Sequence, residues 1–342
     1  MRRLICVMVM LAAFAAFAKP VRVIFDTDMY TDYDDAGALA CLHTLADAGE
    51  CEILATVACT RDAMSVAMCE IINASRGRPD IPVGCTKGIG QSGMDPTHVR
   101  IYGETVRRYA KWVKTLNSND APDATDVYRR VLAAQPDGSV VICSVGFLTN
   151  LRKLLESGPD GHSPLDGRAL VARKVKRWVA MACRYPSGRE YNSGTDAESS
   201  RIALAEWPTP VEIVDFEYGR DCFAGRALAE SGAKDDPVAE IFARQLPSCD
   251  EIRANPAQRL QWCDGLAGHA AWDQVTVLVA VRGTQKHFNV HRGTYRMVGE
   301  KGDDEWVPDE ANGRHLRLTE RMSKDEVGAI LTRLMCRACA VE

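Results

Sequence analysis

Residues 21–35 read VRVIFDTDMYTDYDD, a short β-branched and aromatic run that leads into five aspartates within ten positions. A run of this composition is typical of a strand. Ligands and catalytic groups of open α/β sheets gather beyond the carboxyl ends of the strands, so we expect several of these carboxylates to converge on one edge of a sheet. The stretch therefore predicts both the fold class and the place of a functional site.

Strand-like and helix-like patterns alternate after this stretch, which indicates a parallel sheet covered by helices. Several of the expected strands are continuous apolar runs, as in strands buried on both faces. We predict an α/β fold with an open, mostly parallel, Rossmann-like sheet flanked by helices. The expected strands lie at 21–25, 53–58, 81–84, 139–144, 175–182 and 211–214, and the expected helices at 36–48, 63–75 and 99–114.

The end of the chain has a different pattern. Residues 287–318 are rich in glycine, aspartate and aromatic residues with short alternations, which predicts an antiparallel extension before a last helix at 324–337. There is no internal repeat and no low-complexity linker. Since 46% of the 342 residues are hydrophobic, one sizeable core can form. We therefore predict a single domain over residues 19–342.

Residues 1–18 have the features of a secretory signal peptide. A basic start, MRR, precedes an apolar run at 4–18 that ends in the small-x-small sequence AFA. A membrane anchor is the alternative, but the run is shorter than the about 20 residues that cross a bilayer. We predict cleavage after Ala18, export to the periplasm or the extracellular space, and no stable membrane insertion. The formal charge of −4, without a basic cluster, argues against nucleic-acid binding.

Thirteen cysteines in a chain predicted to be exported raise the question of disulfides. Most lie in apolar segments, and we expect them to be small buried hydrophobic residues. The CxxC motif of Cys336 and Cys339 comes at the end of a helix, where a disulfide stays an open alternative. Without a second half-site, the motif is a weak signal for zinc.

Carboxylates packed as closely as those of residues 26–35 repel one another, and a bound cation removes the repulsion. Ligation by carboxylate and carbonyl oxygens favours a hard ion, with calcium ahead of magnesium in an all-protein site. Two structural alternatives stay open: a solvated acidic surface, and Asp34 and Asp35 as caps of the helix that follows. A strand followed by Asp-x-Asp also occurs in haloacid-dehalogenase-like phosphatases, but Tyr30 and the later Asp-Asp pair fit them poorly.

Five segments occur in the order found in one enzyme family. They are DTD at 26–28 followed by DDA at 34–36, PVGCTKG at 82–88, SVGFLTN at 144–150, REYN at 189–192 with Asp196, and Trp272-Asp273. In these segments the chain resembles the inosine/uridine-preferring nucleoside hydrolases. The resemblance extends from the end of the predicted signal peptide to about residue 282. The resemblance implies the nucleoside hydrolase fold and hydrolysis of the N-glycosidic bond of a small-molecule substrate, a nucleoside or related riboside.

The resemblance also implies roles for single residues. The implied calcium ligands are the carboxylates of Asp28, Asp35 and Asp273 and the main-chain carbonyl of Val145. The implied substrate-binding residues are Asp34, Glu190, Asn192 and Trp272. Asp28 would also be the general base that activates water. Four protein ligands leave room for water and two ribose hydroxyls among the 6–8 positions that calcium accepts.

Simpler interpretations stay open for some of these residues. Glu190 is alternatively an exposed loop acid, and Asp273 alternatively caps or starts a helix. Asp32 has no counterpart in the family pattern; we expect it to face solvent, and the alternatives are that it replaces a metal ligand or supports one. His269 is expected to be structural rather than catalytic.

Position 272 departs from the family pattern. Relatives often have histidine there, which is thought to help the leaving base depart, whereas an indole N–H is no acid near neutral pH. We expect Trp272 either to stack on a base or to fill core volume. Because Trp272 stands where relatives have the histidine that assists the leaving base, the chain is alternatively a non-catalytic protein that binds ribose or a riboside. The family resemblance also implies a homo-oligomer, a dimer or a tetramer.

Overall fold

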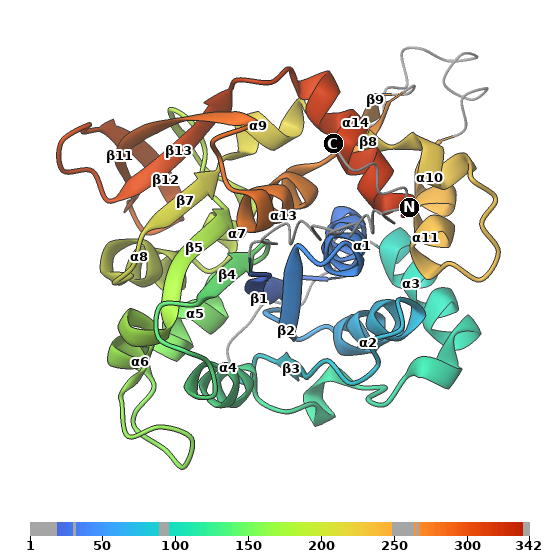
Figure 1. Ribbon diagram of the computed structural model, residues 1–342, viewed down its shortest axis with the longest axis horizontal. Helices are drawn as coiled ribbons and strands as arrows, with labels where there is room; N and C mark the ends of the chain where they lie inside the picture. The colour runs from blue at the N-terminus through green and yellow to red at the C-terminus, as the bar shows by residue number, and fades with distance from the viewer. Residues whose placement is uncertain (1–18, 30–31, 89–95, 248–262, 265–266, 338–342) are drawn as a thin grey trace, which may run out of the picture.

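The computed structural model describes residues 19–29, 32–88, 96–247, 263–264 and 267–337. The main sheet contains β1 (Val21–Thr27), β2 (Cys51–Ala58), β3 (Val83–Cys85), β4 (Val140–Ser144), β5 (Val175–Met181), β6 (Ser187–Gly188), β7 (Val211–Val214), β11 (Phe288–Val298), β12 (Asp303–Pro308) and β13 (His315–Glu320). Their order is β3-β2-β1-β4-β5-β7-β13-β11-β12-β6 (Figure 1). Neighbours from β3 to β13 are parallel, and the remaining pairs are antiparallel. The predicted open, mostly parallel α/β sheet is confirmed.

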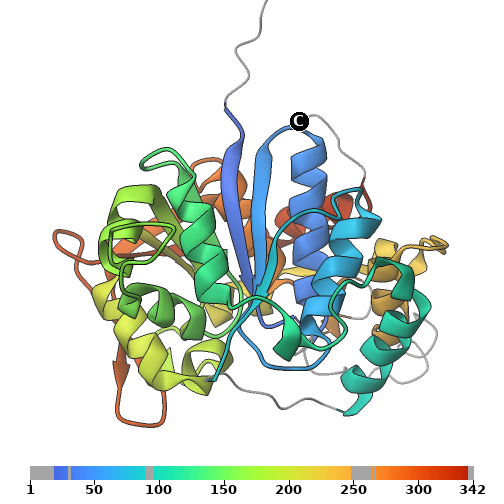
Figure 2. The same ribbon diagram turned by 90° about the horizontal axis from the view of Figure 1, so that it is seen from below.

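Helices cover both faces of this sheet. One face carries α1 (Asp34–Asp47), α2 (Ser65–Ser75) and α13 (Trp272–Arg282), and the other carries α4 (Ala124–Ala133), α5 (Thr149–Glu156), α6 (Gly167–Lys174) and α8 (Ala197–Glu206). Figure 2 shows the blue helices and the green helices on opposite sides of the two blue strands. Alternate residues of β1 serve the two cores, since Val23 and Phe25 join one apolar cluster and Ile24 joins the other.

Two predicted elements have shifted ends. The strand expected at 81–84 is reduced to β3, Val83–Cys85, because the proline before it has no N–H to give to the sheet. The helix expected at 99–114 is α3 (Pro96–Arg108), followed by a 3-10 turn at Ala110–Trp112. The other strands and helices expected up to residue 214 are present close to their expected positions.

The antiparallel extension expected at 287–318 is confirmed. Strand β11 pairs antiparallel with both β12 and β13. Because β13 is also parallel to β7, the extension continues the main sheet instead of forming a separate one. The last helix, α14 (Lys324–Met335), begins with a capping box in which Ser323 and Glu326 bind each other's backbone N–H.

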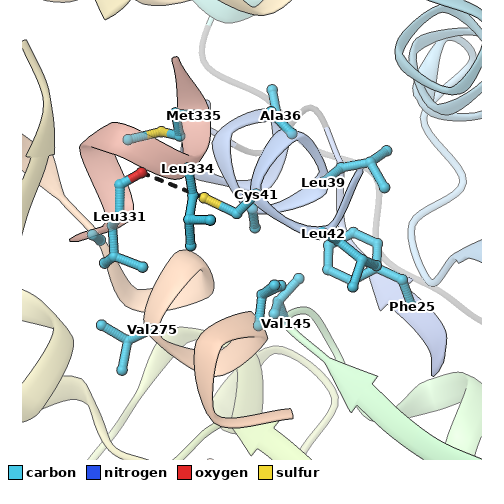
Figure 3. Packing of buried hydrophobic residues seen from close by; sticks show 14 of the residues in the cluster. Phe25, Ala36, Leu39, Cys41, Leu42, Val145, Val275, Leu331, Leu334 and Met335 are labelled. Carbon is cyan, nitrogen blue, oxygen red and sulfur yellow. Dashed lines mark hydrogen bonds between the residues drawn. The ribbon is translucent and has the colours of Figure 1, made fainter. Parts of the chain in front are cut away.

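Helix α1 lies between the sheet, α13 and α14, so it is buried almost along its whole length. Figure 3 shows the thiol of Cys41 directed at the carbonyl of Leu331 on α14, with an S···O distance of 3.7 Å. Nine cysteines with described side chains form no disulfide, and all of them except Cys336 are buried: Cys41, Cys51, Cys59, Cys69, Cys85, Cys143, Cys183, Cys222 and Cys336. They are the small core residues that the sequence predicts. Cys339, the other half of the CxxC motif, lies outside the described residues.

A second, three-stranded sheet joins the C-terminal half of the fold. It consists of β8 (Phe223–Gly225), β10 (Gly268–Ala270) and β9 (Cys263–Asp264), in that order. The remaining helices among the described residues are α7 (Tyr191–Thr195), α9 (Phe216–Arg220), α10 (Arg226–Glu230) and α11 (Pro237–Gln245), and Ser118–Asp120 form a 3-10 turn. In the described part of the chain, no helix combines the length and apolar character needed to cross a membrane.

Several helices begin with an aspartate cap, whereas two helices at the carboxyl edge of the sheet do not. Aspartate side chains cap the first turns of α4, α6 and α11, where Asp123, Asp166 and Asp236 accept bonds from backbone N–H groups. By contrast, α1 and α13 begin after Tyr33 and Ala271, neither of which gives a side-chain cap. Both of these uncapped N-termini lie at the carboxyl edge of the sheet, where the positive end of each helix dipole favours negative charge.

Candidate active site

A pocket of about 480 Å³ lies at the carboxyl ends of β1, β4 and β5. All eight residues to which the sequence assigns a role line it: Asp28, Asp34, Asp35, Val145, Glu190, Asn192, Trp272 and Asp273. Five further residues complete its wall: Asp32, His98, Met181, Tyr191 and Phe216. The carboxyl edge is therefore where the predicted residues meet, although they come from widely separated parts of the chain.

Asp28 lies directly after β1 and is only 4% exposed. Its neighbour across the sheet edge is Gly146, in the turn between β4 and α5. A Cβ at Gly146 would lie 2.4 Å from the backbone nitrogen of Asp28 and 2.8 Å from its Oδ1. Both contacts are too short for a real Cβ, so glycine at this position permits the close approach that places Asp28.

Replacing Gly146 by alanine is expected to displace Asp28 and to lower kcat/KM at this pocket by about 10²-fold, the loss that a misplacement of about 1 Å can cause in an active site. Steady-state kinetics would measure the loss. Gly158→Ala is the matched control, since a Cβ there has no neighbour within 4 Å. Equal activity of the two variants would contradict the positioning role of Gly146.

Asp32, Asp34 and Asp35 form a cluster in which carboxylate oxygens lie within 4.8 Å of one another, as a shared metal ion requires. Asp34 and Asp35 are the first two residues of α1, and the residue before them is Tyr33, so neither is the cap of the helix. The expectation that Asp32 faces solvent is wrong. Its Oδ1 accepts a bond from the backbone N–H of Asp34 (3.0 Å), which turns Asp32 into the pocket.

Asp273 joins this cluster from the far end of the chain. It is the second residue of α13, and its backbone N–H donates to Oδ2 of Asp34 (3.3 Å). The interpretation of Asp273 as a helix cap is wrong, because Ala271 holds that position. The N-termini of α1 and α13 thus meet, and their dipoles favour the negative charge of the carboxylates between them.

Burial and mutual repulsion act against that charge. Burial raises the pKa of Asp34, Asp35 and Asp273 well above the ordinary value, and the neighbouring aspartates raise it further. For Asp32, burial also acts upward, but the hydrogen bond with Asp34 and the charges of two histidines lower the pKa overall. Such buried, crowded carboxylates fit a hard divalent cation, which would replace their protons.

The loop after β5 supplies the other end of the pocket. Glu190 is not an exposed loop acid: it is 2% exposed and caps α7 by accepting bonds from the backbone N–H groups of Asn192 (2.9 Å) and Ser193 (2.8 Å). The amide nitrogen of Asn192 donates to the carbonyls of Val145 (3.0 Å) and Met181 (3.4 Å). This leaves the amide oxygen of Asn192 as the atom that can accept a substrate hydroxyl.

Asp304, which the sequence did not indicate, holds this loop from the C-terminal hairpin. It is fully buried on β12, accepts the backbone N–H of Arg184 (2.8 Å), and lies opposite Gly188 in the β12–β6 pair. Burial raises the pKa of Asp304 to about 7. The position of Glu190 therefore depends on a strand far along the chain.

Trp272 is 7% exposed and is packed into the wall. Its indole N–H donates to the carbonyl of Phe216 (2.8 Å), and the two rings stack with centroids 5.5 Å apart. The core-filling alternative is therefore realised, while the residue still lines the pocket. His269 is buried behind it, with Nδ1 donating to the carbonyl of Ala270 (2.7 Å), which agrees with the expected structural role.

Asp26, the first acid of the motif, does not line the pocket. It is fully buried within the sheet, where it accepts bonds from the hydroxyl of Tyr128 (2.7 Å) and the amide of Asn150 (3.3 Å). Burial raises the pKa of Asp26 to about 7. Its role is to tie β1 to α4 and α5 beneath the site.

His98 lines the pocket although the sequence gave it no role there. It lies in the first turn of α3 and is partly exposed. A single histidine outside every recognised motif gave no signal for a site, because the chain segment between β3 and α4 lacks clear periodicity. Only the fold brings α3 to the same pocket as the aspartates.

The chain is similar to one family over most of its length. The model of the family described as inosine-uridine preferring nucleoside hydrolase matches residues 23–323. Similar solved structures include an inosine-uridine preferring nucleoside hydrolase from Bacillus anthracis (15% identity, TM-score 0.67), which covers 93% of this chain and 99% of that one. A search of curated proteins finds no match.

Two other solved structures have the same fold. A purine-preferring ribonucleoside hydrolase from Gardnerella vaginalis shares 15% identity at a TM-score of 0.65, over 93% of this chain and 99% of that one. The type III effector protein XopQ, complexed with adenosine diphosphate ribose, shares 18% identity at a TM-score of 0.67, over 94% and 95% of the two chains. At these identities the likeness concerns the fold alone.

Proposed function

Because the chain belongs to the inosine-uridine preferring nucleoside hydrolase family, and is thus a hydrolase of N-glycosyl compounds, we propose that it cleaves a nucleoside or related riboside with calcium as cofactor. One observation carries this proposal. Buried aspartates from the N-termini of two helices line the same pocket of about 480 Å³ as Asn192. A pocket of that size is within the range of small-molecule sites.

The proposed calcium ligands are the carboxylates of Asp28, Asp35 and Asp273 and the carbonyl of Val145. Their oxygen chemistry and the raised pKa of Asp35 and Asp273 support a hard cation. Asp32 and Asp34 lie within reach of the same place and add to its negative charge. The bound ion would orient ribose hydroxyls and lower the pKa of a bound water.

Asp28 is the proposed general base. It lies in the pocket at the end of β1, held by the close approach of Gly146, so its carboxylate can take a proton from the water that attacks the sugar. Positive charge develops on the sugar as the bond to nitrogen breaks, and the surrounding carboxylates stabilise that charge. The negative cluster therefore serves the transition state as well as the cation.

The substrate hydroxyls are assigned to Asp34, Glu190 and Asn192, which line the pocket next to the proposed metal ligands. Asn192 would accept through its amide oxygen, since its nitrogen is already bonded to two carbonyls. Trp272 and Phe216 form an aromatic wall on which a flat leaving base can rest.

A nucleoside panel tests the proposal. Purified protein with calcium is expected to release reducing sugar from at least one purine or pyrimidine nucleoside, and chelation with EGTA is expected to abolish the release. Magnesium at the same concentration should restore less activity than calcium, because magnesium fits an all-protein cage poorly. Riboside binding without any release of sugar would instead support the non-catalytic binding function.

The place of the protein is also a proposal. We propose that residues 1–18, which lie outside the described residues, are removed on export, so that N-terminal sequencing of secreted or periplasmic protein would begin at Lys19. The buried thiols do not conflict with export, because thiols enclosed in a core are shielded from oxidants. A homo-oligomer remains part of the same proposal, and light scattering would measure its size.

A further inference from the structure

The loop that carries Glu190 and Asn192 starts from a strained backbone. We call residues 184–194 the sugar loop, because two of the residues assigned to the substrate lie in it. The loop begins after Cys183, whose φ of 70° lies in the left-handed region that non-glycine residues rarely adopt. A residue in such a conformation is retained only where the surrounding structure holds it. The contacts around the sugar loop therefore decide how Glu190 and Asn192 face the pocket.

Hydrogen bonds within the sugar loop fix its shape. Oε1 of Glu190 accepts the backbone N–H of Asn192 (2.9 Å), and Oε2 accepts the backbone N–H and the hydroxyl of Ser193 (2.8 and 3.0 Å). The same hydroxyl accepts the backbone N–H of Cys183 (2.8 Å). Toward the pocket, the amide of Asn192 anchors the loop on the carbonyl of Val145 (3.0 Å). Further support comes from a distant part of the chain.

The hairpin of β11 and β12 contacts the sugar loop at both of its ends. At the start of the loop, Oδ1 of Asp304 accepts the backbone N–H of Arg184 (2.8 Å), and Asp304 pairs with Gly188 in the sheet. At the end of the loop, a Cβ on Gly302 would lie 2.6 Å from the Cα of Gly194, closer than real side chains come. The hairpin thus holds the loop at two points, although no described residue of the hairpin lines the pocket.

The groups around Asp304 come from several elements. Met297 on β11 lies opposite it and carries no charge. The thiol of Cys183, after β5, is buried, and burial raises its pKa, so it stays neutral. Glu217 on α9 accepts a bond from the side chain of Arg184 (3.1 Å), which compensates its charge in part. Glu190, within the sugar loop, is a further acidic neighbour of Asp304.

The charge of Asp304 changes near neutral pH. Burial raises its pKa to about 7; the charges of Glu190 and Glu217 act in the same direction, and the backbone N–H groups of Arg184 and Glu190 act against them. Below that pH Asp304 holds a proton, and above it a buried negative charge faces Glu190. Because the pKa is raised by folding, the support that Asp304 gives is fully present at low pH and is lost as the pH rises through about 7.

We propose that the β11–β12 hairpin clamps the sugar loop and that Asp304 and Gly302 are positioning residues for riboside binding, an inference that rests on the function proposed above. Neither residue lines the pocket. Asp304 fixes the backbone at the start of the loop, and the close approach of Gly302 fixes it at the end. Glu190 and Asn192 between them are then oriented toward the ribose hydroxyls. The proposed calcium ligands belong to other segments, so the clamp governs affinity for the sugar and not for the ion.

Substitution of Asp304 tests the clamp in the kinetics of the best nucleoside of the panel, at saturating calcium and pH 6. Asp304→Ala is expected to raise KM by about 10- to 100-fold, the range for one lost hydrogen bond to a charged group. Its kcat should stay within about threefold of wild type, and its calcium affinity, measured by calorimetry, should not change. Asp304→Asn keeps the acceptor for Arg184 and should restore KM to within about threefold of wild type. Asp303→Asn, the exposed neighbour on β12, is the matched control and should behave as wild type.

A change of pH gives a readout that a general loss of stability would not move. From pH 6 to pH 8, KM of the wild type should rise by about threefold or more relative to KM of Asp304→Asn. The reason is that only the wild-type side chain gains a charge that repels Glu190. The variant should therefore bind the nucleoside better than the wild type at pH 8.

The other contact of the clamp has its own matched pair of variants. Gly302 and Gly299 both have a positive φ (85° and 68°), but a Cβ on Gly299 has no neighbour within 4 Å. Alanine at either position strains the backbone, whereas only alanine at 302 displaces Gly194. Gly302→Ala should raise KM by about tenfold or more, and Gly299→Ala should keep the wild-type KM. Differential scanning calorimetry should show a similar fall in Tm for both.

Three results would overturn the clamp: an unchanged KM in Asp304→Ala, an equal rise of KM in the two glycine variants, or a KM ratio that is constant between pH 6 and pH 8. If Asp304→Ala does not fold, the asparagine and glycine variants decide. If the wild type binds a nucleoside in calorimetric titration but cleaves none, the proposed hydrolysis fails, and Kd replaces KM in the same comparisons. A wild type that neither cleaves nor binds any nucleoside of the panel overturns both the function and the clamp.

Discussion

Replacement of Asp28 by asparagine is expected to lower kcat by about 10⁴-fold, the upper end of the range for loss of a general base. The substitution keeps the shape of the side chain but removes the charge that accepts the proton of water. It also removes one of the carboxylates proposed to hold calcium, so the affinity for the ion should fall as well. Steady-state kinetics and calcium titration by calorimetry would measure the two effects.

Asp80→Asn is the matched control for this substitution, because the side chain of Asp80 is 96% exposed and is not among the residues that line the pocket. It should have wild-type activity and calcium affinity. A variant with asparagine at position 28 that kept more than about a tenth of the wild-type kcat at saturating calcium would contradict the role of Asp28 as base. Circular dichroism of both variants would check that the fold is intact.

Calcium is expected to raise the stability of the protein by about 3 kcal/mol at a free concentration near 100 times its Kd, because the proposed ligands come together only in the folded state. The gain should depend on pH. In the calcium-free protein, Asp34, Asp35 and Asp273 have a pKa well above the ordinary 3.8. Their contribution to stability is therefore fully present below that ordinary value and is lost as the pH rises through the raised pKa.

Calcium at the proposed site would replace those protons, so the difference in Tm between calcium and EGTA should grow from about pH 5 to about pH 8. Differential scanning calorimetry at the two pH values would measure it. Asp35→Asn, which removes one charge of the cluster, should reduce the difference at the higher pH. A difference in Tm that is constant or that shrinks with pH would contradict calcium binding by these carboxylates.

The fold and the centre of the pocket were accessible from sequence because their determinants are local. A β-branched run followed by acids, and the alternation after it, are enough to predict parallel strands and the edge at which they end. The motif that carries Asp28 and Asp35 lies within a few residues of β1, so short spacing already brings these two together. The family match also removes the phosphatase alternative.

The parts that sequence did not predict depend on contacts between distant segments. Asp32 faces the pocket because it bonds to the first turn of α1 and because Tyr102 on α3 donates its hydroxyl to the Asp32 carbonyl (2.5 Å). His98 comes to the same pocket on α3, and no local pattern marks it. Asp304 is a single acid in a hairpin that pairs with residues near Gly188. The periodicity of hydrophobic residues and the spacing of motifs do not predict such contacts between distant segments.

Asp304 holds the loop of Glu190 through a hydrogen bond to Arg184 and the pairing of β12 with β6. This support has a consequence for the order in which the protein folds during synthesis. A chain leaves the ribosome from its N-terminus, and a domain generally folds as a unit. The aspartates after β1, with the strands around them, are available early, but the loop that carries Glu190 and Asn192 lacks its support until β12 has been synthesised and has paired with it. Asp273, which completes the aspartate cluster, also comes late in the chain, so the site becomes competent for sugar only when synthesis is almost complete.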